Sequence, residues 1–259
     1  MFRQKNKWHY GMWAALAVSA LVSANVYADG QADLRNALSR LQASSPVKGV
    51  VEAKIWSRQG EGKDADETQG NASISVEDSG RGLHILYSKD LLTRLDAEER
   101  AKEKDSKSKA PLANVVREFN SSDLRQMISA ASVLSRRLEK ANFKAEKQDS
   151  YNGKPARVLS FEIPIEKLND KDRKYVKKYE GNLEVWIDSD GTPLASRFSE
   201  TVSGRAYIVV SFEIKEDENL SYGVSGDRLV ILKKERKNLS SGAGERSEIR
   251  TIKTLQLQS

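Results

Sequence analysis

Apolar side chains recur at every second position in three segments of the N-terminal part of the chain. The first is VKGVVEAKIW (residues 47–56), where they alternate with charged or aromatic residues from Val51 to Ile55. A two-residue period is typical of a β-strand with one buried face. The segments 70–80 and 81–88 continue the pattern and meet at a glycine-rich turn. We therefore predict three strands here.

Two other segments place apolar residues at helical spacing. Residues 31–44 carry leucines three and four positions apart and end just before a Ser-Pro pair, where a helix is expected to stop. Residues 121–141 form the clearest predicted helix, capped by one of its two leading serines. The charge-rich stretch 98–109 predicts a solvated or disordered loop. The stripe of the longer helix is expected to pack on a sheet, with a ligand groove as the alternative: Leu124, Met127, Ile128, Ala131, Leu134 and Leu138.

The chain from Phe143 to the C-terminus is a series of predicted strands with only short interruptions. Asn152-Gly153 lies between two extended runs and is a strong signal for a two-residue hairpin turn. Consecutive strands joined by short turns form an antiparallel meander, so the predicted fold class is α+β. The remaining strands are expected at 183–187, 194–202, 206–214, 228–237 and 248–257.

The sequence IDSDGTP contains two aspartates and a glycine that invite comparison with a calcium loop. Such a loop needs Asp at three alternate positions and a later Glu. Only Asp188, Asp190 and Gly191 fit, and the next residues offer no run of oxygen ligands. Asp and Gly also supply the geometry of a tight turn. We predict a hairpin turn here, with a calcium site and a catalytic carboxylate pair as the alternatives.

The first 28 residues have the three parts of a secretory signal peptide. A basic head with Arg3 precedes the uncharged stretch 11–24, and Val26-Tyr27-Ala28 places small residues at the two positions that a signal peptidase reads. A retained anchor is the alternative, but a membrane span needs about 20 apolar residues. We expect cleavage after Ala28, a single domain over 29–259, a periplasmic location and no stable membrane anchor.

Charge and cysteine content narrow the class of protein. The formal net charge of +6 includes three basic residues of the signal peptide, which leaves 40 basic against 37 acidic residues. No concentrated basic face is evident, so we expect no nucleic-acid partner. The chain has no cysteine, so hydrophobic burial without disulfides must stabilise the fold.

The sequence offers little that could carry catalysis. Outside the signal peptide there is a single histidine, His84, in a short predicted strand, where we expect it to be half-buried. No nucleophile motif, phosphate-binding loop or cluster of metal ligands accompanies it. Carboxylate chemistry of the glycosidase type would need a sugar cleft, and aromatic residues make up only 7% of the chain. We predict no enzyme, no metal and no cofactor, with a hydrolase as the third-ranked alternative.

The stretch YNGKPARVLSFEIP, followed after a spacer by GNLEVWIDSDGTPLASRFSE, resembles the outer-membrane lipoprotein-sorting (LolA-like) superfamily. That group includes the periplasmic lipoprotein carrier, its outer-membrane receptor and the sensor that regulates the envelope-stress anti-sigma factor. The resemblance implies a curved antiparallel β-sheet, an unclosed half-barrel lidded by helices. It also implies a hydrophobic concavity for acyl chains or lipidated partners.

The sequence therefore predicts a periplasmic lipid- or lipoprotein-binding carrier. The alternative is a periplasmic sensor or scaffold that binds an envelope protein through a sheet edge or the helix 121–141. A curved sheet has more concave face than a few helices can fill, although a closed core is equally compatible with the pattern. Alternation selects these candidate residues for the apolar concavity: Val51, Ile55, Ile74, Val76, Leu83, Ile85, Val185, Ile187, Phe198, Ile208, Val210 and Phe212.

Overall fold

The computed structural model describes residues 29–169, 173–206 and 210–258, which form one sheet and five α-helices. The strands are β1 Val47–Gln59, β2 Asp66–Asp78, β3 Leu83–Leu86, β4 Asn142–Tyr151, β5 Lys154–Glu162, β6 Val176–Ile187, β7 Pro193–Ala206, β8 Val210–Ser225, β9 Arg228–Gly242 and β10 Glu245–Leu257. The helices are α1 Gly30–Arg40, α2 Lys89–Lys104, α3 Pro111–Arg117, α4 Ser121–Ile128 and α5 Ala130–Leu138, with 3₁₀ turns at Gly62–Asp64 and Ile165–Lys167.

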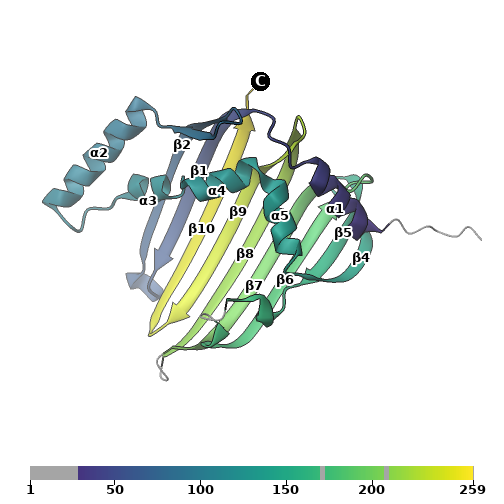
Figure 1. The fold of residues 1–259 in the computed structure, drawn as a ribbon. Helices are drawn as coiled ribbons and strands as arrows, with labels where there is room; N and C mark the ends of the chain where they lie inside the picture. The colour runs from purple at the N-terminus through teal and green to yellow at the C-terminus, as the bar shows by residue number, and fades with distance from the viewer. Residues whose placement is uncertain (1–28, 170–172, 207–209, 259) are drawn as a thin grey trace, which may run out of the picture.

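The ten strands form one antiparallel sheet in the order β3-β2-β1-β10-β9-β8-β7-β6-β5-β4. Strands adjacent in sequence are paired with each other, with the exception of β3 and β4, which are not paired. In addition, β1 pairs with β10. The sheet is thus curved and open, with β3 and β4 as its edges (Figure 1). The predicted fold class, an unclosed antiparallel half-barrel lidded by helices, is confirmed.

Four of the helices cover the concave face of this sheet at one end of the strands (Figure 1). Helix α3 lies on β2 and β1, α4 and α5 lie on β9, and α1 lies on β5 and β7. Helix α2 projects from the body beyond the β2 and β3 edge (Figure 1). None of the helices in residues 29–169, 173–206 and 210–258 is both long enough and apolar enough to cross a bilayer.

The predicted helix 121–141 is two helices in the structure. Ser129, with φ −143° and ψ 59°, ends α4 and begins α5. The cap of α4 is Asn120, whose side chain accepts a hydrogen bond from the Asp123 amide at 2.8 Å, so the prediction of a serine cap was wrong. The break lets the chain follow the curvature of the sheet while Leu124, Met127 and the rest of the predicted stripe still face it.

The charge-rich stretch from residue 98 is helical as far as Lys104, where a loop was predicted. Two features stabilise α2. Ion pairs join residues four apart, such as Arg100 and Asp96 at 2.9 Å. In addition, the Glu98 carboxylate accepts hydrogen bonds from the Leu112 amide at 3.0 and 3.1 Å and so caps the first turn of α3. Tertiary contact therefore overrides the composition of this segment.

Candidate ligand-binding face

The helix-covered face of the sheet carries the predicted apolar residues. Side chains of directly paired residues lie on the same face, and the registers relate Val51 to Ile74 and Val76 to Ile85. Five of the predicted residues are at most 2% exposed, namely Val51, Ile74, Val76, Val185 and Ile187. Four more, Ile55, Leu83, Ile85 and Phe198, are half-buried against the same core. The structure therefore brings nine of the twelve together.

The other three candidates lie away from this cluster. Phe212 pairs with Gly204, and Val210 pairs with Ala206. Phe212 and Val210 thus lie on the same face of the sheet as the other candidates, but at the end of the strands that the α-helices leave uncovered (Figure 1). Both side chains are half-buried and neither belongs to the main core. Ile208 lies outside the described residues.

The apolar part of the concave face is filled by side chains of the helices. Val51, Val185 and their neighbours pack beneath apolar helix side chains that are at most 3% exposed: Leu34, Leu38, Leu124, Met127, Ile128 and Leu134. Of the two readings left open by the sequence, the structure shows the concavity in its filled form.

Beside this apolar stripe, the concave face carries a belt of charged side chains from three neighbouring strands. Lys253 on β10 pairs with Lys234 on β9, which pairs with Leu220 two residues beyond Glu218 on β8. Lys253 is 3% exposed, and its Nζ lies 2.9 Å from Glu118 and 2.5 Å from Asp123. Because Glu118 and Asp123 flank the start of α4, this lysine attaches the helical layer to the sheet.

Lys234 extends the belt between Asp123 and Glu218. Its Nζ lies 2.6 Å from the Asp123 carboxylate and 3.3 Å from that of Glu218. Burial opposes ionisation of both acids, but the surrounding cations outweigh it and hold the pKa of Asp123 and of Glu218 below the ordinary value. Burial likewise opposes the charge on Lys234, and the two carboxylates raise its pKa overall.

Arg137 connects α5 to the same belt. Its guanidinium donates to Glu218 at 2.8 Å and stacks over the ring of Phe198 at 4.7 Å. A polar cavity of about 370 Å³ lies along the belt, between α4 with the residues before it and strands β8 to β10. The concave face therefore carries this charged belt beside the apolar part that the helices cover.

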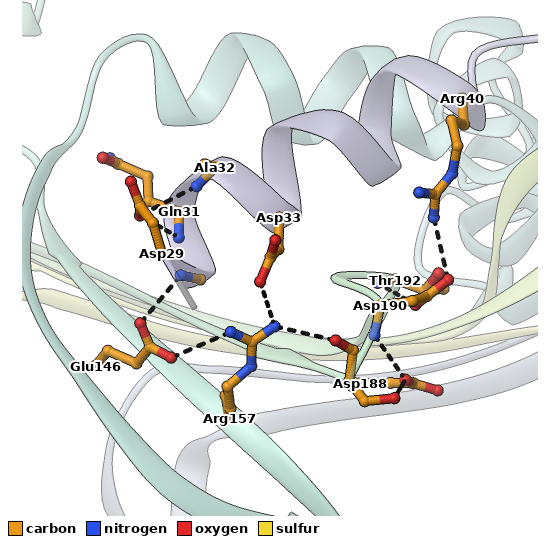
Figure 2. Close-up of polar contacts among 12 residues, drawn as sticks. Asp29, Gln31, Ala32, Asp33, Arg40, Glu146, Arg157, Asp188, Asp190 and Thr192 are labelled. Atoms are coloured by element: carbon orange, nitrogen blue, oxygen red, sulfur yellow. Dashed lines mark hydrogen bonds and ion pairs between the residues drawn. The ribbon is translucent and has the colours of Figure 1, made fainter. Parts of the chain in front are cut away.

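Arg157 on β5 attaches helix α1 to the sheet near its β4 edge (Figure 2). The guanidinium lies 2.7 Å from the Asp33 carboxylate and 3.4 Å from that of Glu146. Glu146 in turn accepts a hydrogen bond from the amide of Gly30, in the first turn of α1, at 3.1 Å. Asp29 caps the same turn through the Gln31 and Ala32 amides.

The segment from Asp188 to Gly191 is a hairpin turn between β6 and β7, as predicted. The Gly191 amide donates to the Asp188 carbonyl at 3.1 Å, and Gly191 has φ +86°. The Asp188 and Asp190 carboxylates accept from backbone amides within the turn (Figure 2). Asp190 also lies 3.0 Å from Arg40. No group of three residues that could hold a metal ion occurs in the described part of the chain.

His84 is exposed, whereas the sequence suggested a half-buried side chain. It pairs with Glu77 on β2 and so lies on the face opposite the core. The two neighbours of His84 in the strand, Leu83 and Ile85, take the inward positions instead.

The inward-facing lysines of the belt, buried Lys253 and half-buried Lys234, were missed by sequence reasoning. In EIRTIKTLQL, hydrophobicity would place Ile252 inside, yet Ile252 is 38% exposed while Lys253 is buried. One signal was available: Leu255 pairs with Val51, and counting back in twos from it reaches Lys253 and Thr251. That signal requires the partner strand to be known.

Comparisons with known proteins give weak similarity to solved structures alone. No family model matches the chain, and no curated protein matches it significantly. Among solved structures it is similar to the LolA superfamily protein NE2245 from Nitrosomonas europaea, at 10% sequence identity and a TM-score of 0.25. That match covers 89% of this chain and 94% of the other. A likeness at this level says nothing about what this chain binds, and the fold described above rests on the sheet topology.

Proposed function

We propose that this protein is a non-catalytic cell-envelope protein that binds the acyl chain of a lipid or lipoprotein on the concave face of its sheet. The observation that carries the proposal is the cover over the apolar face. It consists of three consecutive short helices, α3, α4 and α5, of 7, 8 and 9 residues. They are separated from each other by residues 118–120 and by Ser129.

Helices this short are unstable alone, since isolated helices below about 12–15 residues are marginal in water. Their position therefore depends on packing against the sheet and on the ion pairs of Lys253, Lys234 and Arg137. An acyl chain on the sheet would replace the apolar contacts that Met127 and its neighbours make. Such burial stabilises by about 0.8 kcal/mol per methylene, so a long chain can offset the loss of the helix contacts.

Binding is tested first by native mass spectrometry of the purified protein and by titration with a fluorescent fatty acid. The proposal predicts co-purified lipid or saturable probe binding that is competed by unlabelled fatty acid. A lipid-free protein that does not bind the probe would contradict it.

The role of the helical cover is tested with Lys253→Met, which removes one of the ion-pair attachments of the helical layer and leaves those of Lys234 and Arg137. If the helices must move for binding, loosening them raises the fraction of binding-competent protein and tightens probe binding, while the free energy of unfolding falls. Lys237→Met is the matched control, because Lys237 is a β9 lysine whose side chain is 42% exposed and lies 3.5 Å from Glu248. Equal probe affinity in the two variants would exclude a moving cover.

The location belongs to the same proposal. We expect the protein to be exported with removal of residues 1–28, as the Val26-Tyr27-Ala28 sequence indicates. N-terminal sequencing of the exported form should begin at Asp29. A membrane-bound form that retains Met1 would contradict this part.

A second candidate is a sensor or scaffold that binds an envelope protein by strand addition. The observation that favours it is β4, an edge strand of ten residues that pairs only with β5 among the described residues. The edge carries Lys144, Lys147 and Asp149, and charges of this kind commonly protect an edge from pairing. Capture of a membrane protein by lipid-free protein, lost on Lys147→Pro, would support this candidate.

A further inference from the structure

A cavity of about 460 Å³ lies at the junction of α4 and α5, beside the turn between β2 and β3. This volume falls within the range of roughly 300–1,000 Å³ that is usual for small-molecule sites. Its lining combines three arginines with several serines and a few apolar side chains, among them Arg125, Arg136, Arg228, Ser129, Ser132 and Leu83. The single acidic residue in the lining is Asp78.

Arg228, at the start of β9, is the buried cation of this cavity and is 5% exposed. Its guanidinium donates to Asp78 at 2.8 Å, to the Ser129 hydroxyl at 3.0 Å and to the Ser45 carbonyl at 3.0 Å. The Nε of Arg228 is the one buried side-chain nitrogen or oxygen in the described residues that has no hydrogen-bond partner. Since Asp78 neutralises this arginine, the remaining charge of the cavity comes from elsewhere.

Arg125 and Arg136 supply that charge. Arg125 lies near the end of α4 and Arg136 near the end of α5, and both are exposed at the rim. Within residues 29–169, 173–206 and 210–258, neither makes a hydrogen bond or an ion pair. The cavity therefore has an excess of two positive charges that no carboxylate of its lining balances.

The first turn of α5 adds a further preference for anions. Ser129 is its N-cap residue, yet no side chain caps that turn in the described structure. The amides of an uncapped first turn and the helix dipole both favour a negative group. Ser129 and Ser132 border the cavity at this end of the helix, and the hydroxyl of Ser132 donates to the Ser129 carbonyl at 3.2 Å.

We propose that this cavity binds a phosphate group, held by Arg125 and Arg136 at the rim and by the serine-lined start of α5. Arginine is suited to phosphate because its planar fork matches two phosphate oxygens. Leu83 and Ile128 are also in the lining, and Ile128 belongs to the core beneath the helices. An amphiphile with its phosphate in the cavity would thus have its acyl chain next to the apolar face. The lipid as the source of the phosphate rests on the proposed function, whereas the phosphate site does not.

The test uses two substitutions at the rim, Arg125→Gln combined with Arg136→Gln, which leave the buried Arg228 and Asp78 pair intact. Arg35→Gln combined with Arg40→Gln is the matched control, because both are exposed arginines on α1 outside the cavity. Calorimetric titrations are made with inorganic phosphate, with monolauroylglycerol and with its phosphate monoester, lauroyl lysophosphatidate. Circular dichroism and the thermal midpoint confirm that every variant is folded.

The proposal predicts that the rim variant loses affinity for phosphate and for lauroyl lysophosphatidate by about tenfold or more, as expected for the loss of charge-assisted hydrogen bonds. Affinity for monolauroylglycerol stays unchanged, and the control variant behaves as the original protein. An equal loss in the control would show attraction by overall charge and overturn the site. If the original protein binds neither phosphate nor the phosphate amphiphile, the site is overturned as well.

The same titrations also distinguish the phosphate site from the proposed acyl-binding function. Binding of phosphate without binding of either amphiphile supports the anion site and refutes the acyl-binding function. Equal affinity for the two amphiphiles, with no effect of the rim substitutions, supports acyl binding and refutes the anion site.

Discussion

Gly191, in the turn between β6 and β7, lies directly against the main chain of Asp33 on α1. A β-carbon built on Gly191 would lie 2.3 Å from the Asp33 carbonyl oxygen, and the residue has φ +86°. The turn between β6 and β7, whose sequence resembles a calcium loop, therefore packs directly against α1. Arg40 and Asp190 add an ion pair at the other end of this contact.

Gly191→Ala is expected to lower the free energy of unfolding by about 2 kcal/mol or more, since both the positive φ and the clash with Asp33 oppose a side chain. Gly153→Ala is the control, because Gly153 has φ +76° but nothing within 4 Å of an added β-carbon. Urea denaturation of the two variants measures the difference. Equal losses would mean that α1 does not press on this turn.

Calcium is expected to leave the thermal midpoint unchanged. The carboxylates of Asp188 and Asp190 already accept hydrogen bonds from the amides of Asp190 and Thr192. An ion at a hundredfold excess over its dissociation constant would add about 2.7 kcal/mol, which a melting curve with and without a chelator detects. A rise with calcium would show that the turn binds the ion.

The two ends of the concave face should respond differently to a buried charge. Val185→Glu places a carboxylate at a position that is 0% exposed, so we expect a loss of several kcal/mol or failure to fold. Val210→Glu lies at the end without helices and is half-buried, so the carboxylate can reach water. We expect that variant to keep its circular dichroism spectrum. Unfolding of the Val210 variant would show that this end is also closed.

Acid should weaken the attachment of α4 and α5 to the sheet. The pKa values of Asp123 and Glu218 are lowered in the folded state, so the unfolded chain binds protons more readily. The contribution of these two carboxylates to the free energy of unfolding is fully present above their pKa values in the unfolded chain, about 3.9 and 4.3. It is lost as the pH falls through their pKa values in the folded state. Asp123→Asn combined with Glu218→Gln should flatten the fall in stability between about pH 5 and pH 3. The urea midpoint is measured across that pH range. If the midpoint of the variant falls as steeply with pH as that of the original protein, the acid dependence does not come from Asp123 and Glu218.

Glu200 should behave in the opposite way, because its pKa is raised. Burial and, to a smaller extent, Glu216 disfavour its charge, while a hydrogen bond from Tyr179 favours it. The charged Glu200 carboxylate therefore lowers the free energy of unfolding at neutral pH. This effect disappears below the pKa that Glu200 has in the unfolded chain. Glu200→Gln keeps an acceptor for Tyr179 and is expected to raise the unfolding midpoint at pH 7 but not at pH 4. Glu213→Gln, at an exposed β8 position, is the control.

Local patterns were sufficient to predict most strands and turns. Alternation located the inward residues from Val51 to Phe198, and Asn152-Gly153 forms its hairpin with φ of 52° and 76°. These features depend on neighbours in sequence, so a single chain displays them. The inward face of β10 depends on its partner instead. Lys253 is buried because Glu118 and Asp123 meet it from the helical layer, and no period along the chain reveals that encounter.

The helical layer was predicted less well for the same reason. A continuous helix satisfies the apolar stripe from Leu124 to Leu138, but the structure breaks it at Ser129, where α4 ends and α5 begins. The cavity beside that break arises from three distant segments, which contribute Asp78, Arg125 and Arg228. A site assembled in this way has no sequence motif.

The pairing of β1 with β10 joins the first and last strands of the described chain inside the sheet, between the third and fourth of its ten strands. During synthesis, β1 and its neighbour β2 emerge first and must wait for the last strand before the sheet is continuous. Non-local pairing of this kind slows folding, because the entropy of closing a long loop must be overcome first. Until β10 arrives, β1 and β9 both present open edges that invite aggregation. A chain shortened by its final strand would thus lose the connection between the three strands β3-β2-β1 and the six strands from β9 to β4.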